Sequence, residues 1–128
     1  MGSFKLGTDI CSLARIRKAY TLYGEKFLDK ILTENEKHYV LSQKRRLVES
    51  LAGRFAGKEA VGKALGVGLR GINWREIEII RSSSGAPLVA LHGRAQAIAN
   101  RLNLSQIEIS ISHERDYAIA LVVATSSV

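Results

Sequence analysis

The sequence has few residues that cross-link or stiffen a chain, with one cysteine and one proline among its 128 residues. A lone cysteine, Cys11, excludes an internal disulfide framework, which fits a reducing compartment and argues against a small secreted scaffold. No apolar run approaches the roughly 18 residues that a membrane-spanning helix needs. The first residues, MGSFKL, lack the basic and apolar regions of a signal peptide, so we expect a cytoplasmic protein.

Acidic residues are also scarce relative to basic ones, because 12 Asp and Glu stand against 19 Lys and Arg, a net charge of +7. A basic surface of this kind favours an anionic partner: a nucleic acid, a phosphorylated small molecule or an acidic protein. Aromatic residues make up only 6% and are not interleaved with basic ones as in single-strand nucleic-acid binders. The length and the 46% hydrophobic content predict one domain, residues 1–128, with its own core.

The spacing of apolar residues predicts a mixed α+β domain with strands at both ends of the chain. Alternating or continuous apolar patterns predict strands over residues 3–10, 75–81, 86–91, 106–112 and 117–124. The last of these is an apolar run suited to burial on both faces. Helical spacing predicts helices from Ser12 to Gly24, over 26–32, from Thr33 to Ser42, over 44–65 and over 92–102.

Two of these helices carry further local signals. In the helix after Ser12, one face is predicted to be buried and consists of Leu13, Ile16, Tyr20 and Tyr23. Thr33 and Glu36 have the spacing of a capping box.

The segment GVGLRG, residues 66–71, matches a dinucleotide-binding pattern, but it follows a helix rather than a strand. It is better explained as a helix end and a tight loop whose backbone N–H groups could approach a phosphate.

The long helix carries a charged pair, Glu59 and Lys63, on a stretch otherwise made of alanine, glycine and phenylalanine. One interpretation is a routine surface pair at i,i+4 spacing on a helix that packs closely against a sheet through its small residues. The other is a partly desolvated carboxylate, which is usually paired or bound to a metal. Asp9 is a second acid at a strand end. Two acids and a lysine fit Mg²⁺-assisted chemistry on a phosphate ester or anhydride.

A third candidate site is the strand end SISHERDYA. His113 precedes a turn, and a lone histidine in that setting is most simply a hydrogen-bonded turn residue. Ser110 and Ser112 project from one face of the strand, where they could meet a ligand or water. We interpret the other two histidines as surface residues, Trp74 as partial core and Cys11 as a small buried apolar residue.

Three stretches together resemble the holo-[acyl-carrier-protein] synthases, the short-chain group of 4′-phosphopantetheinyl transferases: GTDI with ARI, FAGKEAVGKALGVG, and SISHERDYAIALVV. Their order and spacing match the family as well as their letters do, GAPLVAL falls between the second and third, and the resemblance covers almost the whole chain. Thr8 and Val67 depart from the commoner isoleucine before the acid and threonine in the loop.

The resemblance implies an antiparallel sheet packed on one long and several short helices. It also implies that coenzyme A donates its phosphopantetheine arm to a serine of apo acyl carrier protein, which supports fatty acid biosynthesis. The other product is adenosine 3′,5′-bisphosphate. A Mg²⁺ ion is then held by Asp9 and Glu59 with the pyrophosphate, inside a homotrimer whose sites lie between subunits. The residues expected to contact the cofactor are Lys63, His113, Gly66, Gly68 and Ser112.

Because the nucleophile comes from the partner, no nucleophile–base pair is expected in this chain. Glu59, through a metal-bound water, is the first candidate for the base and Asp9 the second; we expect His113 to contact a phosphate. The docking surface for the acidic carrier is predicted on the first helix and just beyond it, at Arg15, Lys18, Leu22 and Lys26. Composition alone favours the alternative, that this stripe is an ordinary solvated face.

Two other functions fit parts of the sequence. The charge of +7 is compatible with a small nucleic-acid-binding domain. The same two acids could serve a Mg²⁺-dependent phosphohydrolase that uses water as nucleophile. Incubation with coenzyme A, Mg²⁺ and apo carrier protein separates all three, because only a transferase adds the arm to the carrier.

Overall fold

The computed structural model describes residues 3–126. The strands are β1 (Phe4–Ser12), β2 (Ile77–Arg81), β3 (Pro87–Leu91), β4 (Leu104–His113) and β5 (Tyr117–Ser126). The α-helices are α1 (Leu13–Tyr23), α2 (Glu25–Ile31), α3 (Glu34–Ser42), α4 (Leu47–Ala64) and α5 (Gly93–Arg101). Met1 and Gly2, which belong to the MGSFKL segment used to argue against a signal peptide, lie outside the described residues.

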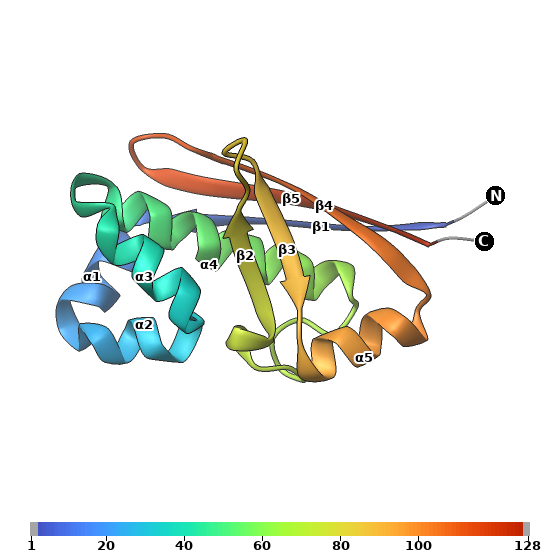
Figure 1. Ribbon diagram of the computed structural model, residues 1–128. Helices are drawn as coiled ribbons and strands as arrows, with labels where there is room; N and C mark the ends of the chain where they lie inside the picture. Colours follow the sequence, from blue (N-terminus) through green and yellow to red (C-terminus); the bar gives the residue numbers. More distant parts are fainter. Residues whose placement is uncertain (1–2, 127–128) are drawn as a thin grey trace.

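The two ends of the chain pair in one antiparallel sheet of order β1-β5-β4, and β2 and β3 form a separate antiparallel hairpin. In Figure 1, α4 runs along this sheet, helices α1, α2 and α3 gather at one end, and α5 lies toward the other. The α+β class and the antiparallel architecture expected from the sequence are therefore confirmed. No helix in the described part of the chain is long and apolar enough to cross a membrane.

Small residues bring α4 into close contact with the strands. A Cβ atom at Gly7 of β1 would collide with the backbone carbonyl oxygen of Ala60 in α4, so only glycine allows this approach. Gly53 and Gly57 of α4 are buried where a side chain would press on isoleucines of β2 and β4. The glycines inside the long helix thus serve its packing against the strands. One consequence is that Asp9, two residues after Gly7, lies beside α4.

The long helix begins later than predicted, at Leu47, because Lys44–Arg46 forms a short 3-10 helix instead. Three consecutive cations at a helix N-terminus oppose the positive end of the helix dipole, which explains the shift. The capping box at the start of α3 is confirmed: the Thr33 hydroxyl accepts from the Glu36 backbone, and the Glu36 carboxylate accepts from Thr33 N. Predicted bounds of the other elements differ from the observed ones by a few residues.

The prediction that the C-terminal strand is buried on both faces is wrong for the single chain. Burial alternates along β5: Ala118, Ala120 and Val122 are buried against α4, while Ile119 and Leu121 are 46% and 49% exposed. The neighbouring β1 presents more apolar side chains on the same outer face, since Leu6 and Ile10 pair in register with Val123 and Ile119. We call this surface the outer face of the sheet; its exposed large apolar residues are Phe4, Leu6, Ile10, Tyr117, Ile119 and Leu121.

Two apolar clusters flank α4. One lies between α4, the sheet and α5, and the other lies under α1, α2 and α3. Trp74 packs on the second cluster, with its ring 4.8 Å from that of Phe55, so its expected place in the core is confirmed. Leu13 and Ile16 of α1 are buried as predicted, but Tyr23 is 62% exposed because it stands at the last turn of α1, beyond the packed surface.

Candidate active site

Four of the predicted functional side chains line one open cavity of about 600 Å³: Asp9, Arg15, Glu59 and Lys63. They come from three elements that are far apart in the sequence. Asp9 lies on β1, Arg15 on the first turns of α1, and Glu59 and Lys63 on the second half of α4. Cys11, Phe55 and Tyr117 complete much of the apolar wall. The fold therefore gathers both acids and two cations around one space.

Lys63 makes its contacts with β1. Its ammonium donates to the backbone carbonyl of Thr8 at 2.9 Å and to Asp9 Oδ1 at 3.3 Å. The routine i,i+4 pair with Glu59, one of the two interpretations from the sequence, is therefore not the arrangement found: within residues 3–126 no ion pair includes Glu59. The partial burial of Glu59 agrees with the second interpretation, a partly desolvated carboxylate, and its binding of a metal stays a prediction.

The environment of Glu59 disfavours its charged form. Partial burial and the nearby negative charge of Asp9 raise the pKa of Glu59, while the Lys63 ammonium opposes this rise. The same wall affects Cys11, because burial and the charge of Asp9 raise its pKa to about 11. The Cys11 thiol donates to the carbonyl of Ala52 at 3.3 Å, so it is a packed thiol with little thiolate, as expected from the sequence.

The donor set fits a magnesium ion that also binds substrate. Among the residues described, no group of three or more His, Cys, Asp or Glu side chains could hold a metal by itself. Asp9 and Glu59 supply hard oxygen ligands that repel each other in the free protein, and a cation between them would relieve that repulsion. Mg²⁺ typically needs only one or two carboxylates when phosphates and waters complete its shell.

His113 and Ser112 do not line this cavity in the single chain. Ser112 points to the outer face with Ser110, as the alternation predicts, whereas His113 lies at the end of β4 on the other side. His113 borders a smaller cavity between α3, α4 and the β2–β3 hairpin. The basic side chains that also line it are Arg46, Arg54 and Arg81. His113 and Ser112 also border a third cavity with Arg115, and its Ile10 and Tyr117 line the acid cavity as well. On one subunit, the acids and His113 thus border different cavities.

Sequence reasoning missed several residues of this second region. Arg54 is buried, stacks 4.7 Å from the centre of the Tyr39 ring, and has an Nε atom without a hydrogen-bond partner among the described residues. Its Nη1 donates to Ser50 at 3.0 Å. Arg54 and Lys58 are four residues apart between buried small residues of α4, and this spacing was the available signal that the two cations share one buried side of the helix.

His92, which was expected at the surface, is exposed, and its Nε2 atom is hydrogen-bonded to Glu78 Oε1 at 3.0 Å.

The loop after α4 closes the helix with its own amides. Gly66 N donates to Lys63 O, and Gly68 N donates to Gly62 O, each at 3.0 Å. Both glycines have positive φ, +84° and +60°, a conformation that ends helices and favours glycine. The interpretation as a helix end and tight loop is confirmed. Contacts of Gly66 and Gly68 with a cofactor stay a prediction, and in this conformation their N–H groups are already used.

The predicted docking residues are on α1 and at the start of α2. Arg15, Lys18, Leu22 and Lys26 are all exposed, and Leu22 keeps 63% of its surface open to solvent. Arg15 and Ala19 also border the cavity that holds Asp9 and Glu59. The stripe therefore leads directly to the cavity rim.

Comparison with known proteins identifies the class. The family model of the 4′-phosphopantetheinyl transferase superfamily matches residues 5–122. A holo-[acyl-carrier-protein] synthase of Gloeobacter violaceus is 44% identical over 118 residues, covering 92% of this chain and 89% of that protein. The crystal structure of the corresponding synthase from Neisseria meningitidis superposes with a TM-score of 0.86 at 36% identity and covers 94% of this chain and 96% of that one.

A second solved structure adds a ligand. The holo-[acyl-carrier-protein] synthase of Helicobacter pylori, crystallised in complex with coenzyme A, has a TM-score of 0.80 and 36% identity, over 93% of this chain and 98% of that one. The chain belongs to the 4′-phosphopantetheinyl transferase superfamily. Within it, several curated relatives at 40–44% identity are holo-[acyl-carrier-protein] synthases, so the resemblance seen in the sequence is confirmed.

Proposed function

We propose that this protein transfers the 4′-phosphopantetheine arm of coenzyme A to a serine of apo acyl carrier protein. The relatives carry the name of that activity, and one neighbour was crystallised with coenzyme A. The observation that carries the proposal is the convergence of Asp9, Glu59 and Lys63 on one cavity, because it matches acids and a cation to a pyrophosphate. A cytoplasmic location and a role in fatty acid biosynthesis are part of the proposal.

Asp9 and Glu59 are the carboxylates that would hold Mg²⁺. When bound, the ion would neutralise charge on the pyrophosphate and help to orient it. Lys63 lies one helical turn from Glu59, and its ammonium is 3.3 Å from Asp9 Oδ1, which supports our proposal that it binds a phosphate oxygen beside both acids. Binding of the pyrophosphate would then compete with Asp9 for this lysine.

The reaction needs a proton acceptor and no further reactant. The serine oxygen of the carrier attacks the phosphorus nearer to the pantetheine. A new P–O bond forms as the bond to adenosine 3′,5′-bisphosphate breaks, and the serine proton is lost. Glu59 is our first candidate for accepting this proton, since burial and Asp9 raise its pKa. Asp9 is the second.

We also propose a homotrimer with sites between subunits. The outer face of the sheet leaves several large apolar side chains exposed, which favours an interface over a solvated surface. On one chain, the acids and Lys63 border one cavity, while His113 borders two others, one of them with Arg46 and Arg54. A neighbouring subunit that brings its His113 region to the acid cavity would supply the cations that a second phosphate of coenzyme A needs.

The test is an incubation with coenzyme A, Mg²⁺ and apo carrier protein, followed by mass spectrometry of the carrier. We expect the carrier to gain the mass of one phosphopantetheine arm and adenosine 3′,5′-bisphosphate to appear in equal amount. Glu59→Gln, which keeps the side chain's shape, and a reaction with excess chelator should both lose the product. Release of the free arm without labelled carrier would show a phosphohydrolase instead, and the absence of both would favour a binding domain.

A further inference from the structure

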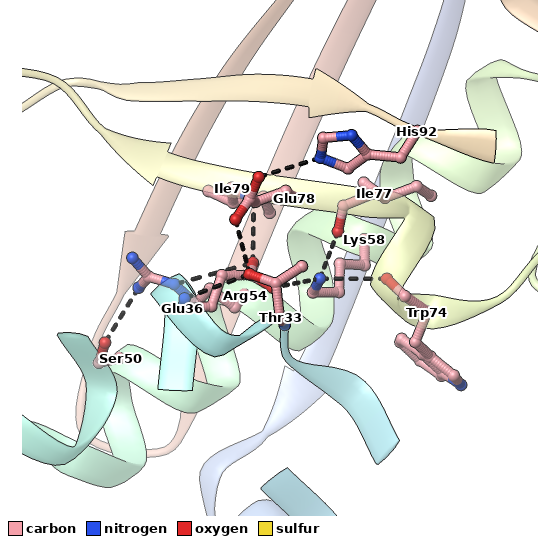
Figure 2. Close-up of polar contacts among 10 residues, drawn as sticks. All are labelled: Thr33, Glu36, Ser50, Arg54, Lys58, Trp74, Ile77, Glu78, Ile79 and His92. Atoms are coloured by element: carbon pink, nitrogen blue, oxygen red, sulfur yellow. Dashed lines mark hydrogen bonds and ion pairs between the residues drawn. The ribbon is translucent and has the colours of Figure 1, made fainter. Parts of the chain in front are cut away.

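A fully buried ion pair, Lys58 with Glu36, involves the residue of α4 just before Glu59, and neither of its members lines the cavity. Lys58 has no exposed surface and Glu36 of α3 is 2% exposed; their charged atoms are 2.7 Å apart. The Lys58 ammonium also donates to the carbonyl of Trp74 at 3.1 Å and to that of Ile77. Its three protons therefore have three acceptors, all outside α4, as Figure 2 shows.

The Glu36 carboxylate connects the same point to two further segments. Its oxygens accept from Thr33 N and from Ile79 N of β2, both at 2.9 Å. Arg54 lies one turn before Lys58 on α4, and its Nε atom is 4.0 Å from Glu36 Oε2. The pair thus joins α4 to the start of α3, to the segment before β2 and to β2 itself. No other polar side chain of α4's second half is held so fully among the residues described.

Stability alone explains such a pair poorly. Removing two charges from water costs so much that well-packed apolar residues are often at least as stabilising as a buried ion pair. A directional contact, however, fixes a position, and α4 needs one. Much of its buried surface consists of small residues, such as Gly53, Ala56, Gly57 and Ala60, and Leu51 and Val61 are the large apolar side chains that are buried on it. Few side chains of α4 therefore project far enough to define its rotation.

Consecutive helical residues point about 100° apart, so the direction of Lys58 sets the direction of Glu59. Lys63 follows Glu59 by about one turn on the same side. We infer that Lys58 and Glu36 are positioning residues: their buried pair holds α4 in the rotation that brings Glu59 and Lys63 to Asp9. This inference rests on the proposed roles of Asp9, Glu59 and Lys63 in the transfer reaction.

The test compares variants that lose the pair with one that loses only stability. Lys58→Met removes the cation and is expected to lower Tm by roughly 10 °C, because Glu36 remains buried and unpaired. Lys58→Met combined with Glu36→Gln leaves no unpaired charge and should recover much of that loss. Leu104→Ala, a buried residue at the start of β4 and far along the sheet from the cavity, is the matched control for lost packing.

All proteins are studied well below their own Tm. Binding of Mn²⁺ in the presence of coenzyme A, followed by electron paramagnetic resonance, should weaken about tenfold or more in Lys58→Met and in the double variant. Losses of this size are typical when residues that orient a metal's ligands are removed. The rate constant kcat should fall with the Mn²⁺ affinity. Leu104→Ala should bind Mn²⁺ like the wild type. Recovery of wild-type Mn²⁺ affinity together with Tm in the double variant would overturn the inference, as would equal weakening in Leu104→Ala.

Two controls separate failure of the positioning inference from failure of a variant to fold and from failure of the metal assignment. If the Lys58 variants do not fold, Glu36→Gln alone decides by the same measurement. Glu59→Gln tests the metal assignment separately: if it leaves Mn²⁺ binding intact, the proposed site is wrong, and amide hydrogen exchange then tests the positioning without any metal. Faster exchange across residues 56–63 in the double variant than in Leu104→Ala supports the role of the pair, and equal exchange overturns it.

Discussion

Lys63 bonds to Asp9, which lies 54 residues earlier in the chain, with 3.3 Å between the ammonium nitrogen and Oδ1. The contact links β1 to the last turn of α4 at the cavity that also contains Glu59. Because the Lys63 side chain remains 53% exposed, the contact adds little to stability and leaves the ammonium accessible to a ligand. This relationship makes the role of Lys63 testable.

Lys63→Ala should weaken coenzyme A binding and slow the transfer. Since Lys63 stands beside both acids, we expect it to bind the pyrophosphate rather than the 3′-phosphate. Steady-state kinetics with coenzyme A and with dephospho-coenzyme A, which lacks the 3′-phosphate, should therefore show equal losses. A loss seen only with coenzyme A would move Lys63 to the 3′-phosphate.

Glu59→Gln should stabilise the metal-free protein while it abolishes transfer. The pKa of Glu59 is raised above its usual 4.5 by burial and by Asp9, so the folded state holds the proton more tightly than the unfolded chain does. Wild-type stability should then decrease relative to the variant as pH rises from 4.5 through the raised pKa. Thermal melts across this range check the sign, and a variant less stable than the wild type near neutral pH would contradict it.

A carboxylate on the outer face of the sheet should prevent assembly. Leu121→Glu would place a charge among the exposed apolar side chains of β1 and β5, where burial in an interface is strongly unfavourable. We expect light scattering to give a trimer for the wild type and a monomer for this variant, with transfer lost. Leu41→Glu, at a comparably apolar exposed position on α3, should remain trimeric. A monomeric wild type that is active would refute the proposed assembly.

Arg15→Glu should weaken the binding of the carrier protein and leave the binding of coenzyme A nearly unchanged. Reversing a charge at the cavity rim is expected to raise the KM for apo carrier by one to two orders of magnitude, on the order of 2 kcal/mol. The KM for coenzyme A should change little, and the wild-type rate should fall as salt rises. Arg17→Glu, exposed on the same helix but outside the cavity, is the matched control. Equal effects of the two variants would place docking elsewhere, with Lys26, Lys30 or the QKRR segment the next to test.

Local sequence signals were reliable where short-range chemistry decides the structure. The capping box of Thr33 and Glu36, the helix end at Gly66 and the alternation of Ser110 with Ile111 all appear as predicted. The start of α4 was missed, because spacing alone does not weigh the charge of Lys44–Arg46 against the helix dipole. The sequence pointed to Asp9 and Glu59 as candidate acids, but it did not predict which residues contact them.

The sequence by itself determined the α+β class, the family, and the identities of Asp9, Glu59 and Lys63 as candidate site residues. Only the tertiary structure decided that Lys63 bonds Asp9 rather than Glu59, and that His113 borders a different cavity of the chain. It also decided that Lys58 is paired inside the protein with Glu36. The reason is physical: periodicity reports which side of an element a residue occupies, whereas these contacts depend on how separate elements pack. The Lys63–Asp9 contact, for example, depends on how closely Gly7 lets β1 approach α4.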